Sequence, residues 1–306
     1  MARKNKQPIR KGVIYTMRII ASLMTAILFI LPLSAFPRVS AGAQDAPASD
    51  SADTLSLFAV NVGKADSLLL RSGNSVYLID TGRGRNSDTV QQALSLFGIT
   101  RLDGVIITHM DSDHVGGLKK LLKSDIQVSK VYIPPFFLPE KDDEDNPAEK
   151  AAKKQDAEIV RLNAGDELPL EGGTLRVLGP LCAAKDKEDN NSLVLLAETS
   201  AGSMLLCGDM EFPEESDLLS AGLISRADVL KIANHGDNDA TSEALLEAVQ
   251  PRAAVISTST EEKSSTPSTR VLRLLQNWKV DVYQTQETSL GVLLTLQNGD
   301  LSVQKY

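Results

Sequence analysis

The stretch from His109 to Gly117, His-Met-Asp-Ser-Asp-His-Val-Gly-Gly, constrains the fold more than any other part of the sequence. It places two imidazoles and two carboxylates within six residues. The preceding run, Gly104–Thr108, is apolar and β-branched, which predicts a buried strand. Leu118–Lys123 carries leucines at helical spacing. We therefore expect these side chains on a loop between a strand and a helix, where rigid scaffolds usually present binding residues.

Imidazole nitrogens and carboxylate oxygens suit divalent metals such as zinc or manganese, and several of them close together suggest more than one ion. The alternative interpretation is a polar turn followed by a helix cap. The tight spacing of His109, Asp111, Asp113 and His114, followed by a Gly-Gly pair, favours metal binding.

The N-terminal residues 1–41 have the composition of a secretory signal peptide. A basic start without acidic residues leads into the uncharged, mostly apolar run Ile19–Phe36 and a small-residue site at Val39–Ala41. An uncleaved membrane anchor is the alternative, because 18 uncharged residues come close to spanning a bilayer. Either assignment predicts an extracytoplasmic protein. Residues 42–53, rich in Ala, Ser, Asp, Gly and Pro, are expected to be a linker, and residues 54–306 the functional domain.

The charge balance bears on binding partners. Residues 1–41 carry seven basic and no acidic residues, so 25 basic and 40 acidic residues remain, a formal charge of −15. Nonspecific nucleic-acid binding needs clustered Lys and Arg, so nucleic acid is disfavoured unless Arg83, Arg85 and Lys119–Lys123 form a local basic rim. One apolar segment cannot build a channel, and the oligomeric state is left open. Of the two cysteines, Cys182 and Cys207, the second ends an apolar run and is expected to be a buried free thiol.

The metal-loop residues resemble the His-x-His-x-Asp-His motif of the metallo-β-lactamase superfamily, with Asp111 in place of the second histidine. Gly-Gly behind that variant resembles the soluble hydrolase domain of the ComEC competence proteins. The resemblance implies an α/β fold, a four-layer αβ/βα sandwich. It extends over about residues 54–304, through Asn61–Ser67, Leu78–Gly82, Ser203–Asp209 and Ala227–Gly236.

The resemblance also implies a two-metal site. One ion would take His109, Asp111 and a bridging Asp209, and the other Asp113, His114, Asp209 and His235. All three histidines of the chain fall on motif positions. The superfamily's mid-chain histidine has no counterpart, and the oxygen-rich set that results favours manganese or magnesium over zinc.

A second group of residues is expected beside the ligands. Asp66 and Asp80 stand where the superfamily places acids near the metal loop, and Asp80 ends a strand from which it could orient a ligand. Arg83 and Arg85 could pair with phosphate at the mouth of the site, or be solvated loop charges. Asn191 lies in Asn-Asn-Ser-Leu-Val, at the expected interval before Asp209.

These expectations predict an exported metal-dependent hydrolase with a metal-bound hydroxide, Asp113 and Asp209 being the residues closest to the chemistry. Its substrate would be a small molecule or a phosphoester, with nucleic acid one candidate. An envelope esterase or phosphorylcholine-type hydrolase is an alternative. A third is a degenerate metal-binding or interaction module, because Asp111 replaces the second motif histidine and the mid-chain histidine has no counterpart.

Overall fold

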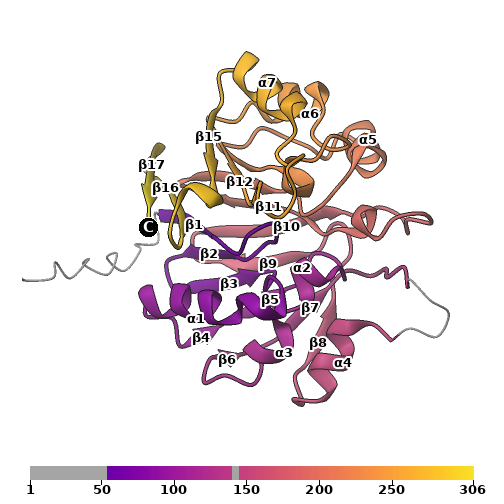
Figure 1. Cartoon of the computed structure of the whole chain (residues 1–306), viewed down its shortest axis with the longest axis vertical. Helices are drawn as coiled ribbons and strands as arrows, with labels where there is room; N and C mark the ends of the chain where they lie inside the picture. Colours follow the sequence, from indigo (N-terminus) through magenta and orange to yellow (C-terminus); the bar gives the residue numbers. More distant parts are fainter. Residues whose placement is uncertain (1–53, 140–144) are drawn as a thin grey trace, which may run out of the picture. The chain divides into compact units, whose positions relative to one another are not determined.

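Two β-sheets lie face to face, and helices cover the outer face of each (Figure 1). The computed structural model describes residues 54–139 and 145–306. The signal segment 1–41 and the linker 42–53 expected from the sequence lie outside the described residues. Within the described ranges, no helix has both the length and the apolar composition needed to cross a bilayer.

The first sheet has eight strands and is mixed. Its N-terminal and C-terminal strands pair antiparallel, and its other edge is parallel. The strands follow the order β17 (Asp300–Lys305), β16 (Gly291–Gln297), β1 (Thr54–Val60), β2 (Leu68–Ser72), β3 (Ser75–Ile79), β5 (Gly104–Ile106), β7 (Val131–Ile133) and β8 (Ile159–Arg161). A separate pair joins β4 (Arg101–Leu102) to β6 (Gln127–Val128).

The second sheet has seven strands, of which β12 to β15 run parallel. They follow the order β15 (Asp281–Gln284), β14 (Ala253–Ile256), β13 (Val229–Lys231), β12 (Gly202–Leu206), β11 (Val194–Thr199), β10 (Gly173–Gly179) and β9 (Glu167–Leu170).

Helices complete the outer layers. The first sheet carries α1 (Ser87–Leu96), α2 (Ser112–Val115), α3 (Leu118–Leu121) and α4 (Pro147–Lys153), and the second carries α5 (Phe212–Ser220), α6 (Glu243–Val249) and α7 (Thr269–Asn277). Figure 1 shows the two groups on opposite sides of the sheets. Short 3-10 helices are η1 (Gly84–Asn86), η2 (Glu188–Asn191), η3 (Ala233–Gly236) and η4 (Thr285–Glu287).

Alternation along β1 explains the layering. Leu57 and Ala59 face the core between the sheets, whereas Phe58 and Val60 face the helix-covered side, and all four are buried. A strand buried on both faces must be apolar at every position, as this one nearly is. The expected four-layer αβ/βα fold is confirmed.

The apolar run Ala227–Gly236 predicts a single strand that ends on His235, and this prediction was wrong. Strand β13 ends at Lys231, and His235 lies in η3 with a φ of 52°. The charged segment 139–157 predicts an exposed loop and a surface helix, and a helix is present at residues 147–153, but it is not only a solvated face. Its helix α4 buries Ala148, Ala151 and Ala152 and packs beside α3. Because alanine carries little hydrophobicity, the apolar stripe is weak in the sequence.

Both cysteines are free in the structure, Cys207 buried and Cys182 exposed. The expectation for Cys207 is therefore met.

Candidate metal centre

Three imidazoles from two distant segments of the chain meet at one edge of the sandwich. His109 follows β5, His114 lies in α2 and His235 in η3, and all three are fully buried. The ring centroids of His109 and His114 are 4.1 Å apart, and those of His114 and His235 are 5.4 Å apart. His109 and His114 follow β5 of the first sheet and His235 follows β13 of the second, so the site lies where strand ends of both sheets meet.

Each imidazole is held through Nδ1. The Nδ1 of His114 lies 2.7 Å from Asp80, and the Nδ1 of His235 donates to the Ser257 carbonyl at 2.9 Å. The Nδ1 of His109 is 3.1 Å from the Thr108 hydroxyl. These contacts leave all three Nε2 atoms buried without a hydrogen-bond partner. Buried polar nitrogens are rarely left unsatisfied, and a metal ligand is one group that would use them.

Asp209 stands between two of these nitrogens. Its Oδ2 lies 3.3 Å from the Nε2 of His114 and 3.2 Å from that of His235, while its Oδ1 has no hydrogen-bond partner. The residue follows β12, and its N–H donates to the Ser192 hydroxyl. A buried carboxylate between two imidazoles suits the bridging role expected from the sequence.

Possible ligand atoms form five overlapping groups around the imidazoles, and two of these bear directly on the predicted ions. His109, His114 and Asp209 make one, and Asp113, His114 and His235 make another. The Asp113 carboxylate lies 3.8 Å from the Nε2 of His235. The residues predicted to bind the second ion therefore lie close together.

The first predicted ion has a further carboxylate that the sequence reasoning missed. Asp189, in η2, lies 3.7 Å from the Nε2 of His109, and Asp111 lies 3.9 Å from the same atom. The three residues form a candidate metal group of their own. Asp189 therefore adds a carboxylate beside His109 and Asp111. Its one sequence signal was its place directly before Asn190-Asn191.

Burial and charge set the protonation of the site. Burial lowers the pKa of His109 to about 4. Burial alone would lower the pKa of His114 too, but Asp209 and Asp80 outweigh it and hold that pKa well above its usual value. Burial, together with Asp209 and Asp111, raises the pKa of Asp189 to about 7. His109 is thus neutral near pH 7, which is the form that ligates a metal.

A buried ion pair lies beside the ligand His235. Lys231, at the end of β13, is fully buried with its Nζ 2.7 Å from Asp66. Asp66 in turn lies 3.8 Å from the Nδ1 of His235. Burial would raise the pKa of Asp66, but Lys231 and His235 outweigh that effect and lower it. Lys231 was missed in the sequence because a lysine in an apolar run has no distinctive signal.

Of the remaining predicted residues, Arg83 contacts a proposed ligand, whereas Arg85 and Asn191 have other partners. Arg83 donates to the Asp113 carboxylate at 3.0 Å, beside Lys64 at 3.5 Å from the same oxygen. Arg85 is instead 60% exposed and pairs with Glu262, which matches a solvated loop charge. Asn191 is buried but donates to Glu188 and accepts from the Ala184 N–H, so it braces η2 and contacts no ligand.

Three of the eight non-glycine residues with positive φ in the described ranges lie at the site. Asp80, Asn234 and His235 have φ values of 60°, 44° and 52°. Side chains other than glycine seldom adopt this region, and such strain clusters at functional sites. The site thus fits divalent cations. Three buried Nε2 atoms lack hydrogen-bond partners, the Asp209 carboxylate lies between two of them, and His109 is neutral.

Comparison with known proteins agrees with this geometry. Residues 60–260 match the family model described as the metallo-beta-lactamase superfamily. ComE operon protein 3 of Bacillus subtilis is 34% identical over 194 residues, 63% of this chain and 25% of that protein. Recombination protein 2 of Haemophilus influenzae is 26% identical over 224 residues, 71% and 26% of the two chains. The chain thus spans about a quarter of the length of these relatives.

A solved structure supports the fold. The metallo-beta-lactamase fold protein YhfI from Bacillus subtilis superposes with a TM-score of 0.52 at 12% identity, over 81% of this chain and 99% of that one. The family match, the four layers and the edge at which the histidines meet lead to the same assignment: the chain belongs to the metallo-β-lactamase superfamily.

Proposed function

We propose that this protein is a metal-dependent phosphodiesterase that acts outside the cytoplasm. The observation that supports the proposal most is the set of buried Nε2 atoms of His109, His114 and His235, none of which has a hydrogen-bond partner. Those of His114 and His235 lie beside Asp209, and that of His109 lies beside Asp111 and Asp189. When bound there, divalent ions would supply Lewis acidity and lower the pKa of a water molecule. Superfamily membership supports a hydrolase, whereas the substrate belongs to the proposal.

The chain's own residues would position the substrate. Arg83 and Lys64 stand beside Asp113 at the rim of the site, and Arg83 has 27% of its side chain exposed. A guanidinium can pair with two phosphate oxygens at once. These two cations would therefore hold an anionic phosphodiester against the carboxylates, which a neutral ester would not require.

Two ions are proposed, with different ligand sets. Asp113, His114, Asp209 and His235 would hold one, and His109, Asp111, Asp189 and Asp209 the other. The second set contains a single nitrogen ligand. Oxygen-rich sets suit manganese or magnesium better than zinc, so we propose manganese as the preferred metal of that position.

Activity and metal content measured together test the proposal. Protein reconstituted with manganese or zinc is expected to hydrolyse bis-p-nitrophenyl phosphate, and Asp209→Ala is expected to lose metal and turnover while keeping its melting temperature. Asp300→Asn, on the exposed strand β17, serves as the matched control. A protein that binds two metals without hydrolysing phosphodiesters would instead favour an envelope esterase. Full metal content in Asp209→Ala would reject the bridging role.

A non-catalytic binding module is the second candidate, favoured by one observation. Asp111 replaces a motif histidine and has 49% of its side chain exposed, a weak position for a ligand. A protein that binds one metal or none, without turnover, would support this module.

Action outside the cytoplasm rests on the basic, then apolar composition of residues 1–41. Expression of the full chain followed by N-terminal sequencing of the extracellular and membrane fractions tests it. A chain that starts near residue 42 outside the cells is the expected result, whereas uncleaved protein confined to the cytosol would reject export.

A further inference from the structure

Glu211 is a buried carboxylate that no part of the proposed metal centre uses. It stands two residues after Asp209 and directly before α5, with 4% of its surface exposed. It belongs to none of the candidate metal groups among the residues that the structure describes. Burying a charge is costly unless hydrogen bonds and an opposite charge compensate it, so the contacts of this carboxylate indicate its role.

The first contacts join Glu211 to η2, the segment that carries Asp189. The Glu211 N–H donates to the Asn190 side-chain oxygen at 3.2 Å, and the Asn190 amide nitrogen donates to Glu211 Oε2 at 3.3 Å. Lys187, which directly precedes η2, donates to Glu211 Oε1 at 2.6 Å. Because Asn190 follows Asp189 in the chain, this reciprocal pair sets where Asp189 stands relative to Asp209.

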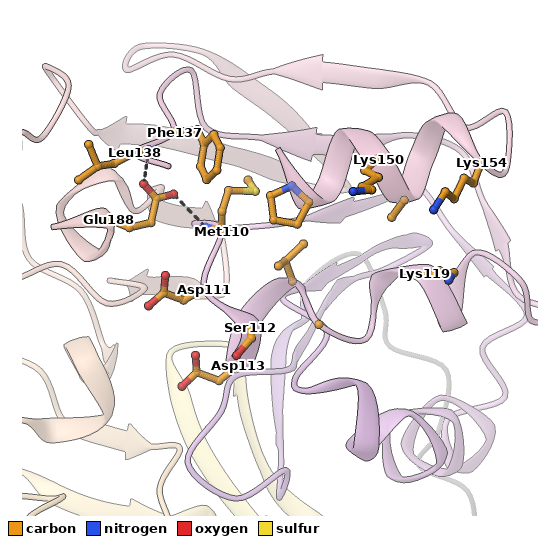
Figure 2. Close-up of a pocket in the computed structure, with 14 residues that line it drawn as sticks. Met110, Asp111, Ser112, Asp113, Lys119, Phe137, Leu138, Lys150, Lys154 and Glu188 are labelled. Atoms are coloured by element: carbon orange, nitrogen blue, oxygen red, sulfur yellow. Dashed lines mark hydrogen bonds between the residues drawn. The ribbon is translucent and has the colours of Figure 1, made fainter. Parts of the chain in front are cut away.

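The opposite side of η2 is tied to the metal loop. Glu188 accepts from the N–H groups of Met110 and Leu138 at 3.0 and 2.7 Å, the two bonds drawn in Figure 2. Met110 lies between the proposed ligands His109 and Asp111. The segment η2 is therefore held on one side by the metal loop and on the other by Glu211.

A further contact joins Glu211 to η3, which carries His235. The side-chain amide of Asn234 donates to Glu211 Oε1 at 3.4 Å, and the Asn234 N–H donates to the Gly208 carbonyl at 3.1 Å. Asn234 and His235 both have positive φ values, a conformation that costs free energy at residues other than glycine. Surrounding contacts must hold such a turn, and the Glu211 carboxylate supplies one of them.

We propose that Glu211 is a positioning residue for the ligands of both ions. It would hold Asp189 on one side and His235 on the other, each in place relative to Asp209. Its charge is paired with a lysine, so the carboxylate is not free to bind an ion itself. Without it, two buried asparagine amides would lose their acceptor, and both segments could shift. This role rests on the metal centre of the proposed function.

Manganese binding by the full chain tests this role. Glu211→Ala is titrated with manganese by calorimetry beside wild type, and His109→Ala and His235→Ala identify which binding step belongs to which ion. Glu211→Ala is expected to weaken both steps by about 10- to 100-fold, the usual effect of removing a residue that orients metal ligands. Two steps with the affinities of wild type would overturn the proposal.

Each link is tested by its own asparagine. Asn190→Ala should weaken mainly the ion that Asp189 is proposed to bind, and Asn234→Gly mainly the ion proposed for His235. Glycine tolerates the φ of 44° at Asn234, so the variant loses the amide without new backbone strain. Equal weakening of both ions by each of the two variants would reject the separate links.

Two further variants separate positioning from a general loss of stability. Glu215→Ala also removes a buried carboxylate, but one that accepts from the Ser242 N–H at 3.1 Å instead of from η2 or η3. If Glu215→Ala weakens manganese binding as much as Glu211→Ala does, the proposal is rejected. Glu211→Gln keeps one acceptor oxygen and should bind manganese more tightly than Glu211→Ala. Absence of this rescue would reject the hydrogen-bonding role.

Hydrogen exchange of the metal-free protein gives a readout that depends on neither metal nor turnover. Glu211→Ala is expected to speed amide exchange in η2 and η3 together and to leave α7 as in wild type. Unchanged exchange in η2 and η3 would overturn the proposal.

The role of Glu211 can be judged even if the proposed function fails. If wild type binds no manganese, the proposed metal centre is wrong, and exchange still shows whether Glu211 joins the two segments. Manganese binding that depends on Glu211, without hydrolysis of bis-p-nitrophenyl phosphate, would sustain the positioning role and reject the phosphodiesterase.

Discussion

The Nδ1 of His114 lies 2.7 Å from the Asp80 carboxylate, and both side chains are fully buried. This carboxylate also accepts from the Thr108 N–H and hydroxyl at 2.8 and 2.7 Å. The imidazole is therefore locked with Nε2 toward Asp209. Residues behind a ligand fix its tautomer and orientation in this way.

Replacing Asp80 with asparagine should weaken metal binding by about 10- to 100-fold, since loss of such a partner typically has that effect. Asparagine tolerates the φ of 60° at this position, so the fold should survive. Metal affinity is measured by competition with a chelating dye. An affinity equal to that of wild type would mean that Asp80 does not orient His114 for metal binding.

Replacing Asp189 with histidine should shift metal preference from manganese toward zinc. Asp189 lies 3.7 Å from the Nε2 of His109, and an imidazole suits zinc better than a carboxylate does. Elemental analysis after incubation with equal concentrations of both metals measures the ratio. Asp186→His, at an exposed position before η2, is the matched control. An equal shift in metal preference in that control would show that Asp189 is not a metal ligand.

Gly117→Ala should destabilise the metal loop. A Cβ at this position would lie 2.3 Å from the Thr81 carbonyl oxygen, so the backbone of one segment must move. Steric overpacking of this kind typically costs about 1–3 kcal/mol. Urea denaturation checks the free energy of unfolding, and a value unchanged from wild type would show that the loop accommodates the methyl group.

Glu214→Gln should stabilise the protein, and more so at higher pH. Burial, with Asp217 and Cys182 nearby, raises the pKa of Glu214 well above 4.5, and its carboxyl oxygens have no hydrogen-bond partner. At pH values between the ordinary pKa of a glutamate in the unfolded chain and the raised pKa in the folded protein, the folded state binds more protons than the unfolded state. The free energy of unfolding therefore falls as pH rises. Glutamine does not ionise, so the variant does not lose stability in this way as pH rises. Its melting temperature should exceed that of wild type by a margin that grows from pH 5 to pH 8, about 2–4 °C per kcal/mol. A constant margin would argue against a neutral buried Glu214.

The sequence was sufficient for the fold because its signals are local and regular. Apolar runs such as Gly104–Thr108 end at sheet edges, where side chains with ligand chemistry follow. Burial of β1 on both of its faces follows from an almost continuous apolar run. The three histidines could be recognised together because the chain contains no others.

The residues that the sequence did not reveal act through tertiary contacts. Asp189 looks like one acid among many in a charged loop, and only the packing of η2 brings it beside His109. Lys231 lies in an apolar strand, and its partner Asp66 is far away along the chain. The turn at His235 depends on positive φ values at non-glycine residues, which no local pattern predicts.

The most direct measurement is a crystal structure of the manganese-soaked protein with an anomalous difference map. We expect two peaks about 3.5–4 Å apart, one near His114, Asp113 and His235 and one near His109 and Asp189, with Asp209 between them. A map without a peak among the three histidines, from a crystal in which the fold is intact and manganese is bound elsewhere, would contradict the metal centre.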